Sequence, residues 1–524
     1  MSAAQETAAG TVAVHALADK AEHGGKVQHR GLITLCVMLA SVMQALDSTI
    51  ANVALPHIQG SLSSTQDQMS WVLTSYIVAA AIMTPLSGWL SSRIGRRRVL
   101  LYSIFGFTLA STWCGIAQSL PEIVGARLFQ GICGAALVPM SQAVLLDINP
   151  PERHVKAMGV WVMGITMGPI LGPALGGWLT EHYSWRWVFF INVPFGILSF
   201  IGLLSFMRET VKVQSRFDFF GFATLSLAIG GFQMLLDRGQ TNDWFSSPET
   251  WIEATVGGLS LYLFIVHLVT TRQPPFISAA LFKDRNFLTG NLFIFLIGVV
   301  LFATLALLPP LLQGLMNYPV VLTGLVTAPR GLGTLAAMVV VGQLVGKIDN
   351  RCIVAAGFTL AALSLWQMTG FYLQMDRSAV IWSGVLQGFG TGCVYLPLSA
   401  IAFATLAPSL RNEGAAVFSL SRNIGSSIGI SVVTTLLTRN TQILHARLAE
   451  NITPFVDSHS ATAQALSSAE GMAGLNALIT RQAAMLAYNN DFHLMLVLTL
   501  CALPLILLVR PVKPAKASEP MVLE

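Results

Sequence analysis

Two stretches of this 524-residue chain, GWLSSRIGRRR (Gly88–Arg98) and GQLVGKIDNR (Gly342–Arg351), indicate its fold. At a shift of 254 residues their glycine, leucine, isoleucine and basic residues coincide. At a shift of 257, Gln130-Gly131 coincides with Gln387-Gly388. A third pair, TIANVALPHIQ (Thr49–Gln59) and TLALLPPLLQ (Thr304–Gln313), matches with one gap. The chain therefore contains an internal repeat, and a repeat determines the architecture.

The sequence around these stretches is apolar, with 54% hydrophobic and 10% charged residues. Ordinary soluble domains carry about 25% charged residues, so a soluble enzyme, a secreted scaffold and a nucleic-acid binder are excluded. The six cysteines lie in apolar stretches without metal-ligand or CxxC spacing, so we expect no metal site. A membrane-crossing helix needs about 20 apolar residues. We therefore expect an all-α polytopic membrane protein.

Fourteen apolar runs are expected to span the membrane. They lie near 31–55, 69–91, 98–118, 120–146, 156–180, 187–207, 218–237, 251–271, 288–312, 319–346, 352–373, 379–406, 413–437 and 491–510. The repeat pairs the first six with the last six. We expect two six-helix bundles, 31–207 and 288–510, two inserted helices within 208–287, and terminal tails at 1–30 and 511–524. Transporters with two such halves bind substrate between them, near the membrane midplane.

The Lys and Arg residues orient the expected helices. If the N-terminus lies inside, cytoplasmic segments hold 21 of the 30, outer segments hold six, and three lie within spans. Cytoplasmic loops carry the excess of Lys and Arg. Both termini are therefore expected in the cytoplasm.

Several motifs resemble those of the major facilitator superfamily. The quoted stretches are GWLSSRIGRRR, LDSTIANVALP (Leu46–Pro56), RLFQGICGA (Arg127–Ala135), GITMGPILGPALGG (Gly164–Gly177), WRWVFFINVPFG (Trp185–Gly196) and LDRGQTNDWFSSPE (Leu236–Glu249). Within the superfamily the chain is most similar to the fourteen-span drug:proton antiporters of the EmrB type.

The resemblance implies the function. It implies an antiporter of the cell inner membrane that exports hydrophobic drugs and toxic amphiphiles, driven by the proton gradient without another cofactor. It also implies a periplasmic membrane-fusion adaptor and an outer-membrane channel as partners, and neither enzymatic activity nor nucleic-acid binding. A narrow-specificity facilitator-type exporter is the first alternative, and a non-transporting receptor or channel is the second.

Asp47 and Arg127 are the candidates for proton coupling. Asp47 is the one acid well inside an expected span, and such residues are functional candidates by default. At 1.5 Å per residue, the two lie at depths that differ by only about 4–5 Å. The resemblance implies that their spans are neighbours. An acid beside an arginine in a low-dielectric site can exchange a proton, although a static pair that stabilises the bundle is the alternative.

Further polar residues in the spans are candidates for a substrate cavity. They are Gln44, Asn52, Gln130, Arg330 and Arg422. For Arg330 and Arg422, cavity contacts and snorkelling or interhelical bonds are equally open. Three arginines against one aspartate bias the membrane region positive, so we expect anionic or neutral amphiphiles as substrates.

The fifth span carries small residues and prolines at regular spacing. The glycines Gly164, Gly168, Gly172 and Gly176 recur every four residues and allow close helix packing, while Pro169 and Pro173 bend the span. The resemblance makes this an antiporter motif, and helix packing alone is the other interpretation.

The loop after the second span resembles the superfamily gating loop, with Gly88, Arg93, Gly95, Arg96 and Arg97 as its candidate residues. It departs from the family pattern at Ser92, where an aspartate is usual. The fourth-span arginine has no counterpart in the second half either, because Gly384 stands at the position equivalent to Arg127. Any coupling through Arg127 is therefore expected in the first half alone.

Residues 438–490 form an unusually long polar to amphipathic outer segment. Helical extension of the last two spans and a docking element for a periplasmic partner are both open. An apolar stripe of Leu475, Leu478, Ile479 and Met485 could contact an adaptor helix.

Overall fold

The structure is a computed structural model that describes residues 29–64, 66–150, 153–209, 217–239, 242–271, 275, 277–345, 347–407, 410–450 and 468–509. The expected tails at 1–30 and 511–524 fall almost entirely outside these ranges. Within them the regular structure is helical, apart from an isolated bridge between Val345 and Ile348. The all-α fold expected from the apolar composition is confirmed.

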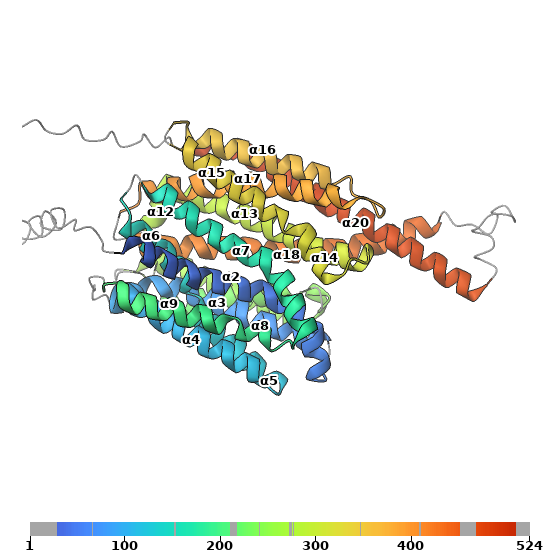
Figure 1. Ribbon diagram of the computed structural model, residues 1–524, viewed down its shortest axis with the longest axis horizontal. Helices are drawn as coiled ribbons and strands as arrows, with labels where there is room; N and C mark the ends of the chain where they lie inside the picture. Colours follow the sequence, from blue (N-terminus) through green and yellow to red (C-terminus); the bar gives the residue numbers. More distant parts are fainter. Residues whose placement is uncertain are drawn as a thin grey trace, which may run out of the picture.

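The first half of the chain forms long helices that run side by side (Figure 1). Their bounds are α2 Arg30–Ser61, α3 Gln66–Ile94, α4 Arg96–Ile116, α5 Leu120–Gly134, α6 Leu137–Ile148, α7 His154–His182, α8 Trp187–Phe190 and α9 Asn192–Phe206. The expected fourth span is interrupted between α5 and α6. Gly95 alone separates α3 from α4, and its φ of 99° lies in the region that glycine adopts without steric cost.

Two helices follow before the second half, α10 Phe219–Arg238 and α11 Pro248–Thr270, with the short η2 Trp244–Ser246 between them. Helix α10 contacts both halves of the molecule. Thr74 on α3 donates a hydrogen bond to Asp237 on α10, and Gln233 on α10 donates to Ser427 in the second half. Helix α11 packs on α10.

The second half repeats the arrangement of the first. Its elements are α12 Ala280–Lys283, α13 Arg285–Pro310, the π-helical turn η3 Leu311–Leu315, α14 Val320–Thr327, α15 Pro329–Leu344, α16 Asn350–Met368, α17 Arg377–Ala404, α18 Arg411–Glu450, α20 Ala469–Leu505 and η5 Ile506–Leu508. Helix α16 begins 254 residues after α4, while α17 and α18 begin 257 residues after α5 and α7. Helix α2 packs along α7, and α13 packs along α18 in the same way.

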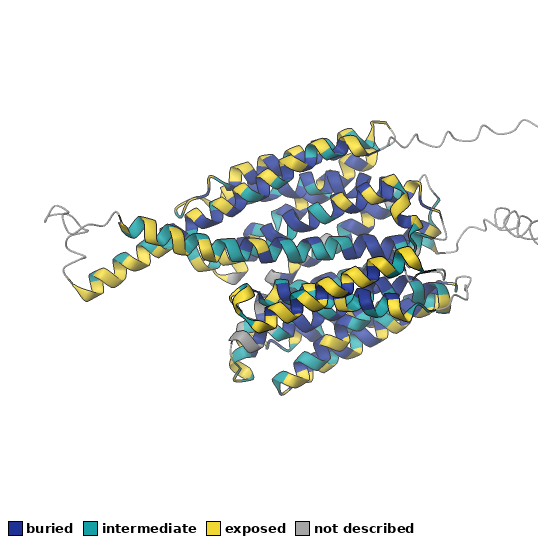
Figure 2. Ribbon diagram, turned by 180° about the vertical axis from the view of Figure 1, so that it is seen from behind, coloured by how far each residue is buried: buried dark blue, intermediate teal, exposed yellow. Residues whose placement is uncertain are grey.

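Thirteen helical segments in the described residues are long and apolar enough to cross a membrane. Helix α7, with 29 residues, has the length to cross as well and occupies the place of the expected fifth span. The chain is therefore a multi-pass membrane protein. The residues coloured as exposed lie mainly on the outward faces of its helices (Figure 2).

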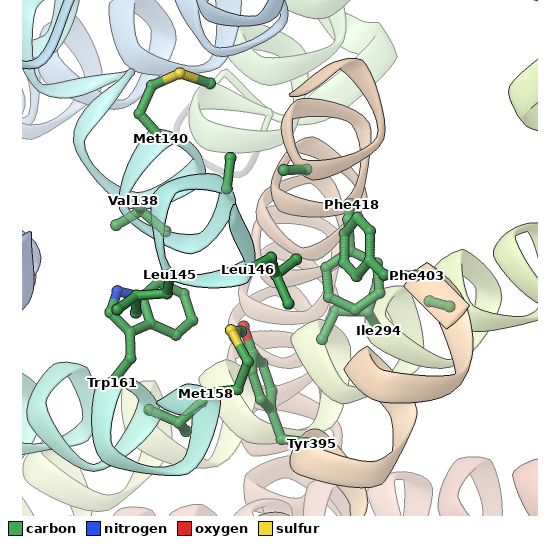
Figure 3. Packing of buried hydrophobic residues seen from close by; sticks show 14 of the residues in the cluster. Val138, Met140, Leu145, Leu146, Met158, Trp161, Ile294, Tyr395, Phe403 and Phe418 are labelled. Carbon is green, nitrogen blue, oxygen red and sulfur yellow. The ribbon is translucent and has the colours of Figure 1, made fainter. Parts of the chain in front are cut away.

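The two ends of the bundle are packed differently. We call the end at which α3 joins α4 the Arg96 end, and the opposite end the hairpin end. One apolar core includes side chains from both halves and lies toward the Arg96 end, where Leu146 on α6 points toward Phe403 and Phe418 of α17 and α18 (Figure 3). Toward the hairpin end each half has a separate core. Apolar packing therefore joins the halves at the Arg96 end.

The last two long helices project from the bundle as an antiparallel pair (Figure 1). We call this pair, residues 438–450 of α18 and 469–482 of α20, the hairpin. Its two helices are joined by a hydrogen bond between His445 and Asn476, 2.9 Å long. Arg481 fixes its base, because its Nε donates to the Leu315 carbonyl at 3.0 Å. Helical extension of the last two spans is thus observed, and residues 451–467 lie outside the described ranges.

Candidate functional site

The site is centred on a carboxylate and a guanidinium buried inside the first half. Asp47 on α2 is 0% exposed and Arg127 on α5 is 1% exposed. Arg127 Nη1 donates to Asp47 Oδ2 at 2.6 Å. The two residues are in direct contact, in keeping with the similar depth that the sequence predicts for them.

Two amides complete the surroundings of the carboxylate. Gln130 Nε2 and Asn192 Nδ2 each donate to Asp47 Oδ1 at 2.9 Å. Asn192 also donates to Ser111 Oγ on α4, and Arg127 Nη1 donates a second time to Gln130 Oε1 at 2.8 Å. Asp47 thus accepts three hydrogen bonds from three side chains, which lie on α5 and α9.

The Arg127 guanidinium is enclosed by aromatic rings. Its Cζ lies 4.4 Å from the centroid of the Tyr76 ring and 5.7 Å from that of Phe189. Its Nε donates to the Val72 carbonyl at 3.2 Å. The Tyr76 hydroxyl accepts a hydrogen bond from Gln44 at 3.1 Å, so the predicted cavity residue Gln44 belongs to the outer layer of the same site.

Helix α7 backs the segment of α2 that carries Asp47. A Cβ on Gly168 would lie 2.7 Å from the Ala45 carbonyl carbon, and Thr49 donates to the Gly168 carbonyl at 3.3 Å. Gly164 and Gly172 also face α2, and Gly176 is buried. Helix α7 runs through Pro169 and Pro173, whose side chains lie outside the described part of the chain, as does that of Asn52.

The second half has a glycine face of its own. Gly425 and Gly429 on α18 follow Gly168 and Gly172 by 257 residues, and they lie directly against Phe295 and Val299 of α13. Close packing of the first and fifth helices is therefore common to both halves. The antiporter role of the α7 glycines stays a prediction beside this packing.

The loop at the Arg96 end is tied to its surroundings by its arginines. Arg96 is buried and forms an ion pair with Asp147 on α6. Arg97 Nη2 donates to the Leu204 carbonyl of α9 at 2.6 Å. Arg93 is exposed and stacks over the Trp89 ring, while Gly88 accepts a hydrogen bond from Ser92. The Ser92 position therefore holds no charge pair, and Asp147 supplies the acid for Arg96.

The two other arginines within the spans lie in different surroundings. Arg330 on α15 is 6% exposed, and its Nη1 and Nη2 have no hydrogen-bond partner among the described residues. Its Cβ and backbone nitrogen lie beside Gly384 on α17. Arg422 on α18 is half-buried and bonds weakly to its neighbour Asn423 at 3.5 Å. The site in the first half contacts neither residue.

Two buried polar residues, Asn192 and Asp491, were not predicted as functional from the sequence. Asn192 contacts Asp47, and its signal was available, because it is the single polar residue between Trp187 and Gly196. Asp491 was treated as the first residue of a span at 491–510. Helix α20 runs continuously through it, and Asp491 is 1% exposed. The expectation that Asp47 is the one acid well inside a span is therefore wrong.

Comparison with known proteins gives the family. Residues 37–430 match the family model of the Major Facilitator Superfamily. The chain belongs to the major facilitator superfamily. It is 38% identical over 427 residues to the multidrug export protein EmrB of Escherichia coli K12, covering 81% of this chain and 83% of that protein. It is 37% identical over 489 residues to the fatty acid resistance protein FarB of Neisseria gonorrhoeae, covering 91% and 96%.

A solved structure of the superfamily has the same fold. The proton:xylose symporter XylE, bound to 6-bromo-6-deoxy-D-glucose, superposes with a TM-score of 0.59 at 12% identity, covering 91% of this chain and 97% of that one. The expected major facilitator fold is thereby confirmed. The roles of the individual site residues stay predictions.

Proposed function

We propose that this superfamily member is a proton-coupled antiporter that exports hydrophobic drugs and amphiphiles from the cytoplasm or the inner membrane. The observation that carries the proposal is the Asp47 carboxylate, fully buried and bonded to Arg127, Gln130 and Asn192. The names of the EmrB and FarB relatives support the export of drugs and fatty acids. The excess of Lys and Arg supports a cytoplasmic Arg96 end, cytoplasmic termini and a hairpin outside.

The geometry supplies a way to couple the proton to movement. With Asp47 ionised, Arg127 and the two amides hold α2, α5 and α9 together through one carboxylate. Protonation removes the negative charge, and Arg127 is then left as a buried cation supported by the Tyr76 and Phe189 rings and the Val72 carbonyl. An unpaired buried charge is costly. The protonated state therefore favours a rearrangement of these helices.

Helix α7 carries that rearrangement to the other half. It packs against α2 at Gly168 and contacts α14, α15 and α17 of the second half. The shared apolar core holds the Arg96 end together in the conformation described here. Exchange of the Asp47 proton between the two membrane faces thus accompanies the rocking of one half against the other.

Transport in everted membrane vesicles tests this function. An imposed proton gradient should drive uphill movement of laurate and, more weakly, of the cation ethidium. Asp47→Asn, which mimics the protonated acid, should abolish uphill movement while leaving substrate binding. The exposed Asp376→Asn is the matched control, because Asp376 lies at the start of α17 outside the site. Uphill pumping by Asp47→Asn at the parent rate would contradict the assignment. A channel would show no uphill movement, a receptor no movement, and a narrow exporter would move one solute class.

Arg330 supports a preference for anionic or neutral substrates. Its Nη1 and Nη2 are buried without a partner in the described residues, and such a cation attracts a carboxylate or another anionic group. The fatty acid resistance of the FarB relative fits a substrate that carries a carboxylate.

The hairpin is the proposed contact for a periplasmic membrane-fusion adaptor, which an outer-membrane channel would complete. The predicted stripe needs correction: Met485 is buried in the core of the second half, and Leu475 and Ile479 are half-buried. Leu478 remains 59% exposed, and Met472 and Ile443 are 49% and 41% exposed. These three residues are the apolar surface that the hairpin offers to a partner.

A further inference from the structure

The second half contains a buried acid whose role the proposed function does not explain. Asp491 on α20 is 1% exposed, and neither of its carboxyl oxygens has a hydrogen-bond partner among the described residues. The described residues also place no Lys, Arg or His nitrogen within ion-pair distance of it. This contrasts with Asp47, whose carboxylate accepts three hydrogen bonds.

The internal repeat places Asp491 at a defined position. Helices α9 and α20 end at Phe206 and Leu505, 299 residues apart, and the same shift brings Asn192 onto Asp491. Helix α9 packs on α2 and α4, as α20 packs on α13 and α16. Asp491 therefore occupies in the second half the position from which Asn192 contacts Asp47 in the first half.

The other polar positions of the site are rearranged between the halves. A shift of 257 residues brings Gln130 onto Gln387 and Asp47 onto Thr304. Gln130 donates a hydrogen bond to Asp47, and Gln387 Nε2 likewise donates to Thr304 Oγ1, at 3.1 Å. The second half thus has a hydroxyl where the first has its acid. The acid of the second half is instead Asp491, on the last helix. Arg330 stands 254 residues after Tyr76, at the equivalent position, and it does not pair with Asp491.

The surroundings of Asp491 are apolar. Phe492 and Met495, which neighbour Asp491 on α20, belong to an apolar core that also contains Leu365 and Met368 of α16. A shift of 254 residues brings Ser111 onto Leu365, so the position that holds the hydrogen-bond partner of Asn192 in the first half is apolar in the second half. Helix α13 carries no titratable residue beyond Arg285 at its start, and α16 carries only Arg351 and Cys352 in its first turn.

The remaining titratable groups near this helix do not neutralise the acid. Helix α18 carries Arg411 and Glu413 at its start, Arg422 in its membrane part and Arg439 in the hairpin, and among the described residues none of them pairs with Asp491. On α20 itself Tyr488 precedes Asp491 by less than a turn and His493 follows it by two residues. An ionised carboxylate without a donor or a cation is strongly disfavoured in such a site, whereas the neutral acid is tolerated.

We propose that Asp491 is a second proton-binding site, which holds a proton in the conformation described here while Asp47 is ionised. Proton binding at Asp491 stands on its own geometry. Its participation in transport rests on the proposed antiport, in which the exporter would then exchange one more proton per substrate molecule than Asp47 alone provides. The proton enters and leaves as H⁺ on the carboxyl oxygen, without another reactant.

Infrared difference spectra of the purified full-length protein test the binding directly. The carbonyl stretch of a protonated carboxyl group should disappear at alkaline pH in the parent. In Asp491→Asn this component should be missing throughout, and in Asp47→Asn it should remain. Because Asn resembles the neutral acid, Asp491→Asn should keep the parent melting temperature, and Asp491→Glu should restore a protonated carboxyl band. A band of parent intensity in Asp491→Asn would overturn the proposal.

A transport measurement separates this inference from the proposed function. In proteoliposomes, the pH gradient that just balances a fixed ethidium gradient reports the number of protons exchanged. Asp491→Asn should need a steeper pH gradient, corresponding to one proton fewer per ethidium. An unchanged balance point would remove Asp491 from the transport cycle. Failure of the parent protein to move substrate uphill under a proton gradient would contradict the proposed function and leave the infrared result on Asp491 unaffected.

Discussion

Gly168 on α7 and Ala45 on α2 are in backbone contact, so closely that a Cβ on Gly168 would lie 2.7 Å from the Ala45 carbonyl carbon. Ala45 precedes Asp47 by two residues, and α7 also contacts three helices of the second half. We therefore expect the helix that carries the buried acid and the helix that contacts the other half to move together, because interiors packed at this density transmit displacements.

This contact predicts the effect of a larger residue at Gly168. Gly168→Val should push α7 away from α2, destabilise the protein by about 1–3 kcal/mol as overpacking does, and abolish ethidium efflux. Gly258→Val on α11 is the matched control, since a Cβ there would meet nothing within 4 Å. Melting temperatures of the purified variants and vesicle transport are the measurements. A Gly168→Val protein with parent stability and transport would show that the contact is not needed.

Because Arg127 is enclosed beside Asp47, its substitutions should impair transport to different degrees. Arg127→Ala leaves Asp47 as a buried carboxylate without its cation, and breaking a buried pair costs about 3–5 kcal/mol. Arg127→Lys keeps the charge but loses the planar guanidinium that bonds Asp47, Gln130 and Val72 together. We expect proton-driven efflux to be impaired in both, and less in Arg127→Lys. Equal efflux in the two variants, with equal protein in the membrane, would argue against a role for the charge.

Arg330 Nη1 and Nη2 are buried without a hydrogen-bond partner among the described residues. Removing this side chain should therefore raise the stability of the protein and lower its export of anionic substrates. Arg330→Ala removes an uncompensated buried cation, so the melting temperature should rise while laurate export falls and ethidium export is retained. Arg377→Ala, at the exposed start of α17, is the control for loss of an arginine. Resistance and vesicle uptake assays with laurate and with ethidium measure whether export of the two substrates changes differently. Equal loss for both would contradict selection by charge.

If the hairpin is the contact for the periplasmic adaptor, removing it should abolish adaptor binding without unfolding the pump. The replaced segment should be 444–478, because Arg481 and Met485 fix the base of the hairpin to the second half. A short Gly/Ser linker in its place should abolish co-purification of the adaptor and leave vesicle transport intact. Leu478→Asp offers a milder version on an exposed residue. Retained adaptor binding in both variants would exclude the hairpin as the contact.

The sequence by itself determined the membrane class, the helices and the repeat. These follow from apolar runs of spanning length and from matches at nearly constant shifts, and both are local or pairwise properties of the chain. The similar depth of Asp47 and Arg127 could be expected from the sequence, because the helical rise converts residue number into distance along the membrane normal. That their spans are neighbours came from the resemblance to the family.

Only the tertiary structure decided which side chains share a site. Depth says nothing about the direction in which a side chain points. The sequence therefore did not reveal that Asn192 completes the Asp47 site, or that Arg330 Nη1 and Nη2 have no hydrogen-bond partner among the described residues. It also misplaced Asp491, because hydropathy marks a boundary at a charged residue even where the helix continues beyond the membrane. The burial of that carboxyl group depends on the apolar side chains of other helices, which only the packed bundle brings together.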